Sequence, residues 1–196
     1  MRSFLLFLAL STGLAPFAAH AVERPAGIPV EKLDKTENQR LDELFGELKK
    51  SGNDRAAGRI ASRIAQRWSN SGSASVDLMM LWSKQAMDQE KWDVALDFLD
   101  QVTAMKPDYA EGWNRRATVH FMMRNFAKSM ADIEKTLELE PRHFGALAGM
   151  AQIFKARGDK ETALSIYSRV LDVYPMMREA QQEVSTLSEE LAGQPI

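Results

Sequence analysis

The sequence predicts an all-α fold, a solenoid in which helical hairpins stack one on another. Two observations carry this prediction. Pro107, Pro141 and Pro175 are equally spaced, and each comes directly after a stretch rich in helix-forming residues. Proline lacks the amide hydrogen and clashes with the preceding turn, so it ends a helix. Within each interval, large and small residues recur at the same positions, which indicates one repeated structural unit.

Length and composition limit the class of protein. The chain has 196 residues, enough for one ordinary domain with a sizeable core. Hydrophobic residues make up 45% and charged residues 27%, which is typical of soluble globular proteins. The formal net charge is −2, so no basic footprint favours nucleic acid or an anionic membrane surface. The chain has no cysteine, which excludes disulfides, thiolate metal sites and thiol catalysis.

Residues 1–21 are typical of a secretory signal peptide. Arg2 supplies a positive charge, an apolar run follows, and Ala19-His20-Ala21 fits the small-x-small pattern that precedes cleavage. The competing interpretation is an uncleaved membrane anchor, but a spanning helix needs about 20 apolar residues, and this run is shorter. We therefore expect cleavage near Ala21, a periplasmic or secreted protein, and no stable membrane span in the mature chain.

The next two segments precede the clear repeats. Residues 22–36 hold Pro25 and Pro29 without helical periodicity, so we expect a flexible leader there. Residues 37–75 are predicted to form a helical hairpin, because two apolar stripes of helical period flank a polar turn. This hairpin lacks a closing proline. It is therefore either a degenerate repeat or an N-terminal cap, since the ends of repeat arrays are atypical.

Three units of equal length follow, at 76–109, 110–143 and 144–177. Each unit divides into two helices, and Gly158 marks the turn between the helices of the third. Small residues at the eighth and twentieth positions let the two helices approach closely. These small residues are Ser83, Ala117, Ala151, Ala95, Ser129 and Ala163. Beyond the third unit, residues 178–191 carry a narrow apolar stripe, which predicts a C-terminal capping helix.

The repeated units resemble the tetratricopeptide repeat family, whose marks are a period of about 34 residues, the large–small pattern and a closing proline. The third unit matches best, and its signature residues are Leu147, Met150, Ala151, Phe154, Gly158, Ala163, Tyr167, Val170 and Pro175. The second unit departs at Arg116, where the family favours an apolar residue, and at His120, where it favours an aromatic one. The resemblance covers residues 76–175 and implies a right-handed superhelix that serves as a binding scaffold, here an exported bacterial member.

The resemblance also implies where a partner would bind. In this family the first helix of each hairpin lines the concave groove, with side chains at its second, fifth, ninth and twelfth or thirteenth positions pointing inward. The corresponding residues are Met80, Lys84, Met87, Asn114, Thr118, Phe121, Met122, Gln152 and Lys155. The apolar members either offer an adaptable surface to a partner or pack on a neighbouring helix, and spacing does not decide between these. A family-type carboxylate clamp is not expected, because Gly145 and Gly149 replace its basic residues in the third unit.

The sequence indicates no catalytic residue, no cofactor and no metal site. His120 and His143 are far apart in the sequence, and neither has metal-ligand spacing to another ligand. His120 occupies an aromatic position, so packing explains it, whereas His143 follows a helix-stopping proline and is expected to be exposed. The chain shows no phosphate-binding glycine loop and no serine nucleophile motif.

We therefore expect an exported scaffold, in the bacterial cell envelope, that binds a protein or peptide partner by complementarity along its groove. The main alternative is a self-assembling structural protein, with Leu41, Leu44 and Leu48 beginning a self-association helix, which would make the protein a homo-oligomer. An enzyme would need a catalytic constellation assembled across distant helices. A small-ligand carrier would need a closed apolar cavity.

Overall fold

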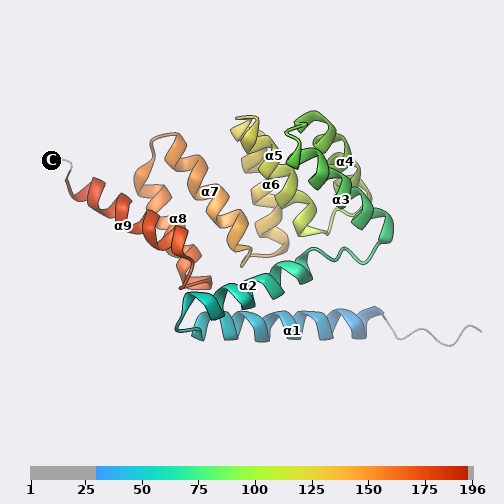
Figure 1. Ribbon diagram of the computed structural model, residues 1–196, viewed down its shortest axis with the longest axis horizontal. Coiled ribbons are helices and arrows are strands. Elements are labelled where there is room, and N and C mark those ends of the chain that lie inside the picture. The colour runs from blue at the N-terminus through green and yellow to red at the C-terminus, as the bar shows by residue number, and fades with distance from the viewer. Residues whose placement is uncertain (1–29, 194–196) are drawn as a thin grey trace, which may run out of the picture.

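The structure, a computed structural model, describes residues 30–193, with side chains from Glu37 onward. Within this range the chain forms nine α-helices and no strand, arranged as a row of hairpins with a separate hairpin along one edge (Figure 1). The predicted all-α solenoid is therefore confirmed. The predicted signal peptide, and the predicted leader up to Pro29, lie outside the described residues.

The helices of the row pair in sequence order. The first hairpin is α3 (Ala74–Asp88) with α4 (Trp92–Met105), the second is α5 (Ala110–Met122) with α6 (Phe126–Leu139), and the third is α7 (Phe144–Ala156) with α8 (Lys160–Val173). The helix α9 (Arg178–Ala192) packs against α8 at the end of the row (Figure 1). Each hairpin also packs on the next, through α4 with α5 and α6 with α7.

The small residues lie where the two helices of each hairpin meet. Ala95, Ala117 and Ala151 are buried, as is Ser129, whose hydroxyl donates a hydrogen bond to the backbone oxygen of Ala117 at 2.8 Å. A buried hydroxyl needs such a partner, because an unsatisfied polar group in the core is costly. The serine therefore combines small size with a hydrogen bond between the two helices of its hairpin.

The turns inside the three hairpins repeat the same backbone conformation. Glu90, Arg124 and Gly158 stand one period apart, and all three have positive φ angles of 56°, 61° and 83°. A left-handed residue just after a helix lets the chain reverse direction. Only Gly158 adopts it without the steric cost that a side chain imposes.

The N-terminal hairpin consists of α1 (Val30–Lys50) and α2 (Asp54–Trp68), and it lies along the edge of the row formed by the turns between units (Figure 1). Outside the hairpin, α1 packs against α8. The helix α1 begins at Val30, two turns before the predicted start at Glu37, so the predicted leader is too long. The physical reason is that no proline or glycine follows Pro29 until Gly46, so nothing stops a helix.

The N-terminal hairpin contacts the turn that follows each of the three units. At the first turn, the hydroxyl of Tyr109 donates a hydrogen bond to the backbone oxygen of Ser69 at 3.0 Å. At the second, the indole of Trp68 stacks on the ring of His143, with centroids 4.1 Å apart and planes inclined by 12°. At the third, Tyr174 packs against the core of the hairpin. One hairpin therefore bridges three turns at positions set by the repeat.

The structure shows that the prediction of an exposed His143 is wrong, because its side chain is 2% exposed. Its Nδ1 accepts a hydrogen bond from the backbone amide of Ala146 at 3.1 Å and so caps α7. Its Nε2 therefore carries the hydrogen and lies 3.3 Å from a carboxylate oxygen of Glu111. A residue after a helix-stopping proline stays exposed only where nothing covers the turn, and here Trp68 of α2 covers it.

The carboxylate of Glu111 lies beside His143 and Arg115 and is largely buried, with 15% of its side chain exposed. Burial disfavours its charged form, but the hydrogen bond with His143 and the charge of Arg115 outweigh this effect, so the pKa of Glu111 is lowered. Arg115 also holds the carboxylate through an ion pair of 2.8 Å. The second turn is thus tied to the preceding unit by a buried polar cluster.

A second charged cluster, in which Asp132 is buried and Asp100 is exposed, explains why the second unit departs from the family pattern at Arg116. Its guanidinium makes two hydrogen bonds, of 2.7 and 2.8 Å, to the carboxylate of Asp132 and a further bond of 2.8 Å to Asp100. Asp100 belongs to α4, whereas Arg116 and Asp132 belong to the second hairpin. A bidentate charge-assisted pair therefore takes the place of apolar contact inside the second hairpin, and the bond to Asp100 links this pair to the first unit.

His120 packs in the same region. Its Nε2 lies 3.9 Å from a carboxylate oxygen of Asp132. Burial is the main cause that lowers the pKa of His120, the charges of Arg116 and Lys128 act in the same direction, and those of Asp132 and Asp100 oppose it. The expected packing role of His120 agrees with its position in the core.

Replacing Trp68 with alanine is expected to release the N-terminal hairpin while α3–α8 stay folded. The change removes the stack on His143 and about 2–3 kcal/mol of packing, less than for a fully buried tryptophan because Trp68 is only half-buried. Hydrogen exchange should become faster in α1 and α2 alone. Trp82→Ala, at an exposed position of α3, is the matched control and should leave these helices protected. Equal acceleration in every helix after Trp68→Ala would contradict the expectation.

Acid should destabilise the fold through His120. Between the lowered folded pKa and the unfolded value near 6.5, the unfolded chain binds a proton that the folded chain excludes, so the free energy of unfolding falls as the pH falls. One proton accounts for at most about 1.4 kcal/mol per pH unit. His120→Phe restores the aromatic residue that the family favours. It should reduce the loss of urea-unfolding free energy between about pH 7.5 and 5.5, whereas equal losses in both proteins would disprove the assignment.

Candidate functional site

The predicted groove residues lie on α3, α5 and α7, the first helices of the three hairpins, and they differ in exposure. The exposed ones are Lys84, Thr118, Met122, Gln152 and Lys155; the half-buried ones are Met87, Asn114 and Phe121; the buried one is Met80. We refer to the five exposed residues as the A-helix face. This face is the part of the prediction that a partner can reach.

The repeat arranges part of the A-helix face as a row. Lys84, Thr118 and Gln152 each occupy the ninth position of their unit, and all three are exposed. One further period leads to Thr186 of α9, which is also exposed. Sequence reasoning missed Thr186 because the last helix was assigned to capping alone, although the period continues through Pro175. Packed helices lie about 8–10 Å apart, which equals roughly three residues of an extended chain.

Most of the apolar groove residues serve the core. Met80 is 4% exposed and packs within the core of the first hairpin, and Met87 packs against the same core. Phe121 packs against the core of the second and third hairpins and against Phe126, with ring centroids 5.6 Å apart. Met122 differs, because 53% of it is exposed. The spacing left two alternatives open for these residues, a contact surface or packing. Packing applies to Met80, Met87 and Phe121, whereas Met122 offers an exposed surface.

The lysines of the A-helix face are held by exposed ion pairs. The Nζ of Lys84 lies 2.6 Å from a carboxylate oxygen of Asp88, and the Nζ of Lys155 lies 2.6 Å from one of Glu183 on α9. Exposed pairs of this kind contribute less than about 1 kcal/mol. Either lysine can therefore exchange its carboxylate for one of a partner. Glu183 is a second residue that sequence reasoning missed, for the same reason as Thr186.

Two neighbouring polar groove residues are hydrogen-bonded within the chain. The side-chain amide of Asn114 donates to a carboxylate oxygen of Glu111 at 2.9 Å, which turns it toward the buried cluster at His143. The hydroxyl of Thr118 donates to the backbone oxygen of Asn114 at 3.0 Å. Because Thr118 is exposed, its oxygen can still accept a hydrogen bond from a partner.

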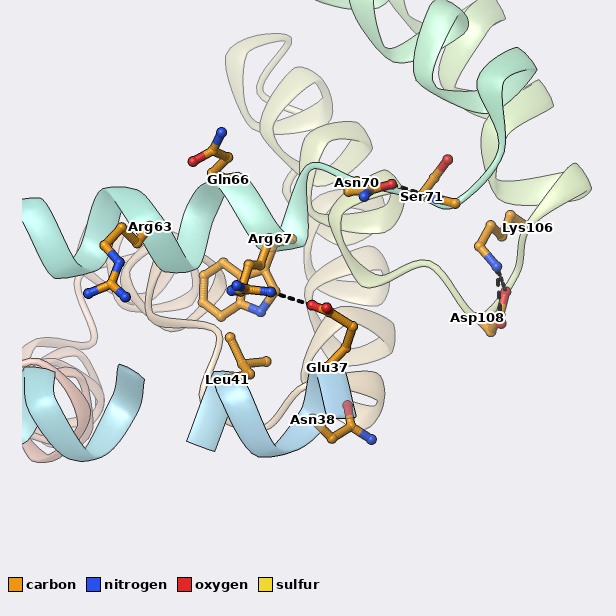
Figure 2. Close-up of a pocket in the computed structure, with 12 residues that line it drawn as sticks. Glu37, Asn38, Leu41, Arg63, Gln66, Arg67, Asn70, Ser71, Lys106 and Asp108 are labelled. Atoms are coloured by element: carbon orange, nitrogen blue, oxygen red, sulfur yellow. Dashed lines mark hydrogen bonds and ion pairs between the residues drawn. The ribbon is translucent and has the colours of Figure 1, made fainter. Parts of the chain in front are cut away.

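A separate hollow of about 870 Å³ lies between the N-terminal hairpin and the first turn between units. Figure 2 shows Glu37 meeting Arg67 across it, and Lys106 meeting Asp108 at its far side. Arg63 pairs with Glu47 at 3.3 Å. The charges of this hollow are thus paired within the chain. Its residues come from segments far apart in the sequence, so no local motif could have indicated it.

The predicted self-association stripe lies mostly inside the N-terminal hairpin. Leu44 and Leu48 are buried there, and Leu41 is half-buried against the same core. These leucines therefore hold α1 on α2 and on the row, and they are not a free surface for a second molecule. If the protein self-associates, another surface must do it.

The described residues contain neither a candidate metal site nor a candidate membrane-spanning helix. Across residues 30–193, no group of three or more His, Asp or Glu side chains is placed to hold a metal ion. In the same part of the chain, no helix combines the length and the apolar character that crossing a membrane requires.

Comparison with known proteins gives both sequence relatives and structural neighbours. No family model matches the chain. A TPR repeat-containing protein of Rhizobium etli is 45% identical over 193 residues, which span 98% of this chain and 95% of that protein. Small glutamine-rich tetratricopeptide repeat-containing protein 2 of Saccharomyces cerevisiae is 26% identical over 97 residues, 50% of this chain and 28% of that protein.

Solved structures show the same fold at low sequence identity. The first TPR domain of Spaghetti (RPAP3), bound to the HSP90 peptide SRMEEVD, has a TM-score of 0.58 and 24% identity, and the match covers 62% of this chain and 96% of that one. The TPR2B domain of yeast Sti1, in complex with pHsp70, has a TM-score of 0.56 and 21% identity, over 60% of this chain and 99% of that one. With the bacterial relative covering nearly its whole length, the chain belongs to the tetratricopeptide repeat family.

Proposed function

We propose that this chain is an exported scaffold that binds a protein or peptide partner across the A-helix face. The observation that carries the proposal is the row of exposed side chains at the ninth position of successive units, Lys84, Thr118 and Gln152. A regular fold places these side chains before any partner arrives. Binding then costs little ordering of the scaffold, which favours affinity.

The side chains of the A-helix face indicate which partner segment would fit this face. Lys84 and Lys155 stand on α3 and α7 and suit carboxylates near both ends of the segment. Between them, Thr118 and Gln152 offer hydrogen bonds and Met122 offers an adaptable apolar contact. A partner with this pattern is an extended peptide of about six to nine residues, given roughly three residues of extended chain per helix.

The solved structures with the HSP90 peptide and with pHsp70 support a peptide as the class of partner. The family-type carboxylate clamp does not transfer, because Gly145 and Gly149 occupy the positions that would supply basic residues in the third unit. We therefore propose a peptide recognised along the helices in place of one held by its terminal carboxylate. The proposed action is binding, with no covalent chemistry.

Export to a bacterial envelope is the second part of the proposal. It is supported by the signal-like residues 1–21 and by the bacterial origin of the relative that spans nearly the whole chain. The mature protein would begin at Val22. The periplasm, or secretion, is then the place of action.

A photo-crosslinking residue at Thr118 or Gln152 should capture a distinct partner in the native cell envelope. The same probe at Arg169, exposed on α8, is the matched control and should capture none, because α8 is the second helix of its hairpin and does not carry the A-helix face. Thr118→Arg should reduce capture from Gln152 at least about fivefold by placing a charged side chain in the row. Equal capture at Thr118 and Arg169, or only a second copy of the chain, would overturn the assignment of this face.

Cleavage should occur after Ala21 when the full chain is produced in bacteria. Mass spectrometry of the exported protein should find an N-terminus at Val22. Ala21→Trp should block processing because the cleavage site requires a small residue there, whereas Ala26→Trp, beyond the site, should be processed normally. Recovery of only the intact N-terminus in the membrane fraction would show an uncleaved anchor instead.

A further inference from the structure

The helix α9 repeats the buried and the exposed positions of α7. Leu187 stands one period after Ile153, and both are buried. Thr186 stands one period after Gln152, and both are exposed. A helix with the pattern of a first helix of the repeat presents an equivalent face beside the preceding one. The row of exposed ninth positions therefore continues from α7 to α9.

An ion pair joins α7 to α9. The Nζ of Lys155 lies 2.6 and 2.8 Å from the two carboxylate oxygens of Glu183. Lys84, the other lysine of the A-helix face, pairs within its own helix, with Asp88 one turn further on. The carboxylate at Lys155 thus comes from a different helix and meets the ammonium with both of its oxygens.

The pair of Lys155 and Glu183 is open to solvent. The side chain of Lys155 is 43% exposed and that of Glu183 is 28% exposed. In the described part of the chain, neither side chain makes a second ion pair. A carboxylate arriving from solvent can therefore take the place of Glu183 at the ammonium without breaking another ion pair.

The position of α9 does not depend on this ion pair. Ala180 and Leu187 are fully buried and pack in the core of the third hairpin, which holds α9 on α8. Burial of apolar side chains contributes far more than an exposed ion pair does. Glu183 can therefore leave Lys155 by a change of its own rotamer, with α9 in place.

We propose that Glu183 is an internal competitor for the carboxylate of the partner at Lys155. The inference rests on the proposed function and specifies how the A-helix face is regulated. In the free protein Glu183 holds the ammonium of Lys155. A carboxylate of the bound segment displaces Glu183, so one exposed ion pair replaces another.

Tethering makes this competition effective although the pair itself is weak. A group held in the same molecule, within reach of its target, acts at a high effective concentration. The partner gains only the difference between its own contact with Lys155 and the contact that Glu183 already makes. The remaining affinity must come from the other residues of the A-helix face, and the bound segment is released more easily as a result.

The two lysines of the A-helix face should therefore differ in what they contribute. The pair of Lys84 and Asp88 lies within one helix, and each of its side chains is 60% exposed. The pair of Lys155 and Glu183 is less exposed and uses both carboxylate oxygens. A carboxylate of the partner consequently gains more at Lys84 than at Lys155.

Photo-crosslinking from Thr118 in the native cell envelope tests the proposal through the yield of captured partner. Glu183→Gln should raise the yield by up to about fivefold, the most that an exposed ion pair can withhold. Lys155→Gln should lower the yield, and Glu183→Gln added to Lys155→Gln should bring no gain, because the competition needs both residues. Glu189→Gln is the matched control, since Glu189 is exposed on α9 and its side chain contacts Ser185 of the same helix. It should leave the yield unchanged.

A yield unchanged by Glu183→Gln would overturn the proposal, as would a gain that persists without Lys155. An equal gain from Glu189→Gln would also overturn it, by showing a general effect of negative charge. Hydrogen exchange in α9 should be the same with and without Glu183→Gln, and faster exchange would show displacement of the helix instead. In these cases the A-helix face still captures its partner. Absence of capture by the unaltered chain would instead remove the proposed function and this inference together.

Discussion

The stacking of Trp68 on His143 is the contact on which the arrangement of this molecule depends. It places the end of α2 against the second turn between units, and the rest of the N-terminal hairpin then follows the line of the turns. The same stack buries His143 and thereby brings its Nε2 to Glu111, whose pKa is lowered. Because the N-terminal hairpin packs along the turns, it leaves the outer side of α3 uncovered.

The repeat determines which positions face the core. Where a residue departs from the pattern, neighbouring side chains compensate for it. Arg116 stands at an apolar position, and the chain supplies Asp132 and Asp100 to pair with it. A buried arginine is tolerated only with such partners, because an uncompensated charge in the core is strongly destabilising. The departure at Arg116 therefore marks a junction joined by charge where the third hairpin uses apolar packing.

Periodicity was sufficient to predict the helices of the three units, because prolines and small residues recur at fixed intervals. It could not predict the course of the N-terminal hairpin, since Trp68 and His143 are far apart in the sequence and neither belongs to a local motif. The same limit applies to the candidate site. Helical spacing identifies the side on which Met80 and Met122 lie, but only the packed neighbours determine that the first is buried and the second exposed.

A solenoid of stacked hairpins changes its curvature by small rotations between successive units. The N-terminal hairpin is attached at the turn that follows each unit, through Tyr109, His143 and Tyr174. It therefore restrains the edge of the solenoid on which these turns lie, because any change of curvature must displace the three attachments together. The spacing between α3, α5 and α7 is stiffened as a consequence, so the A-helix face keeps a nearly constant pitch.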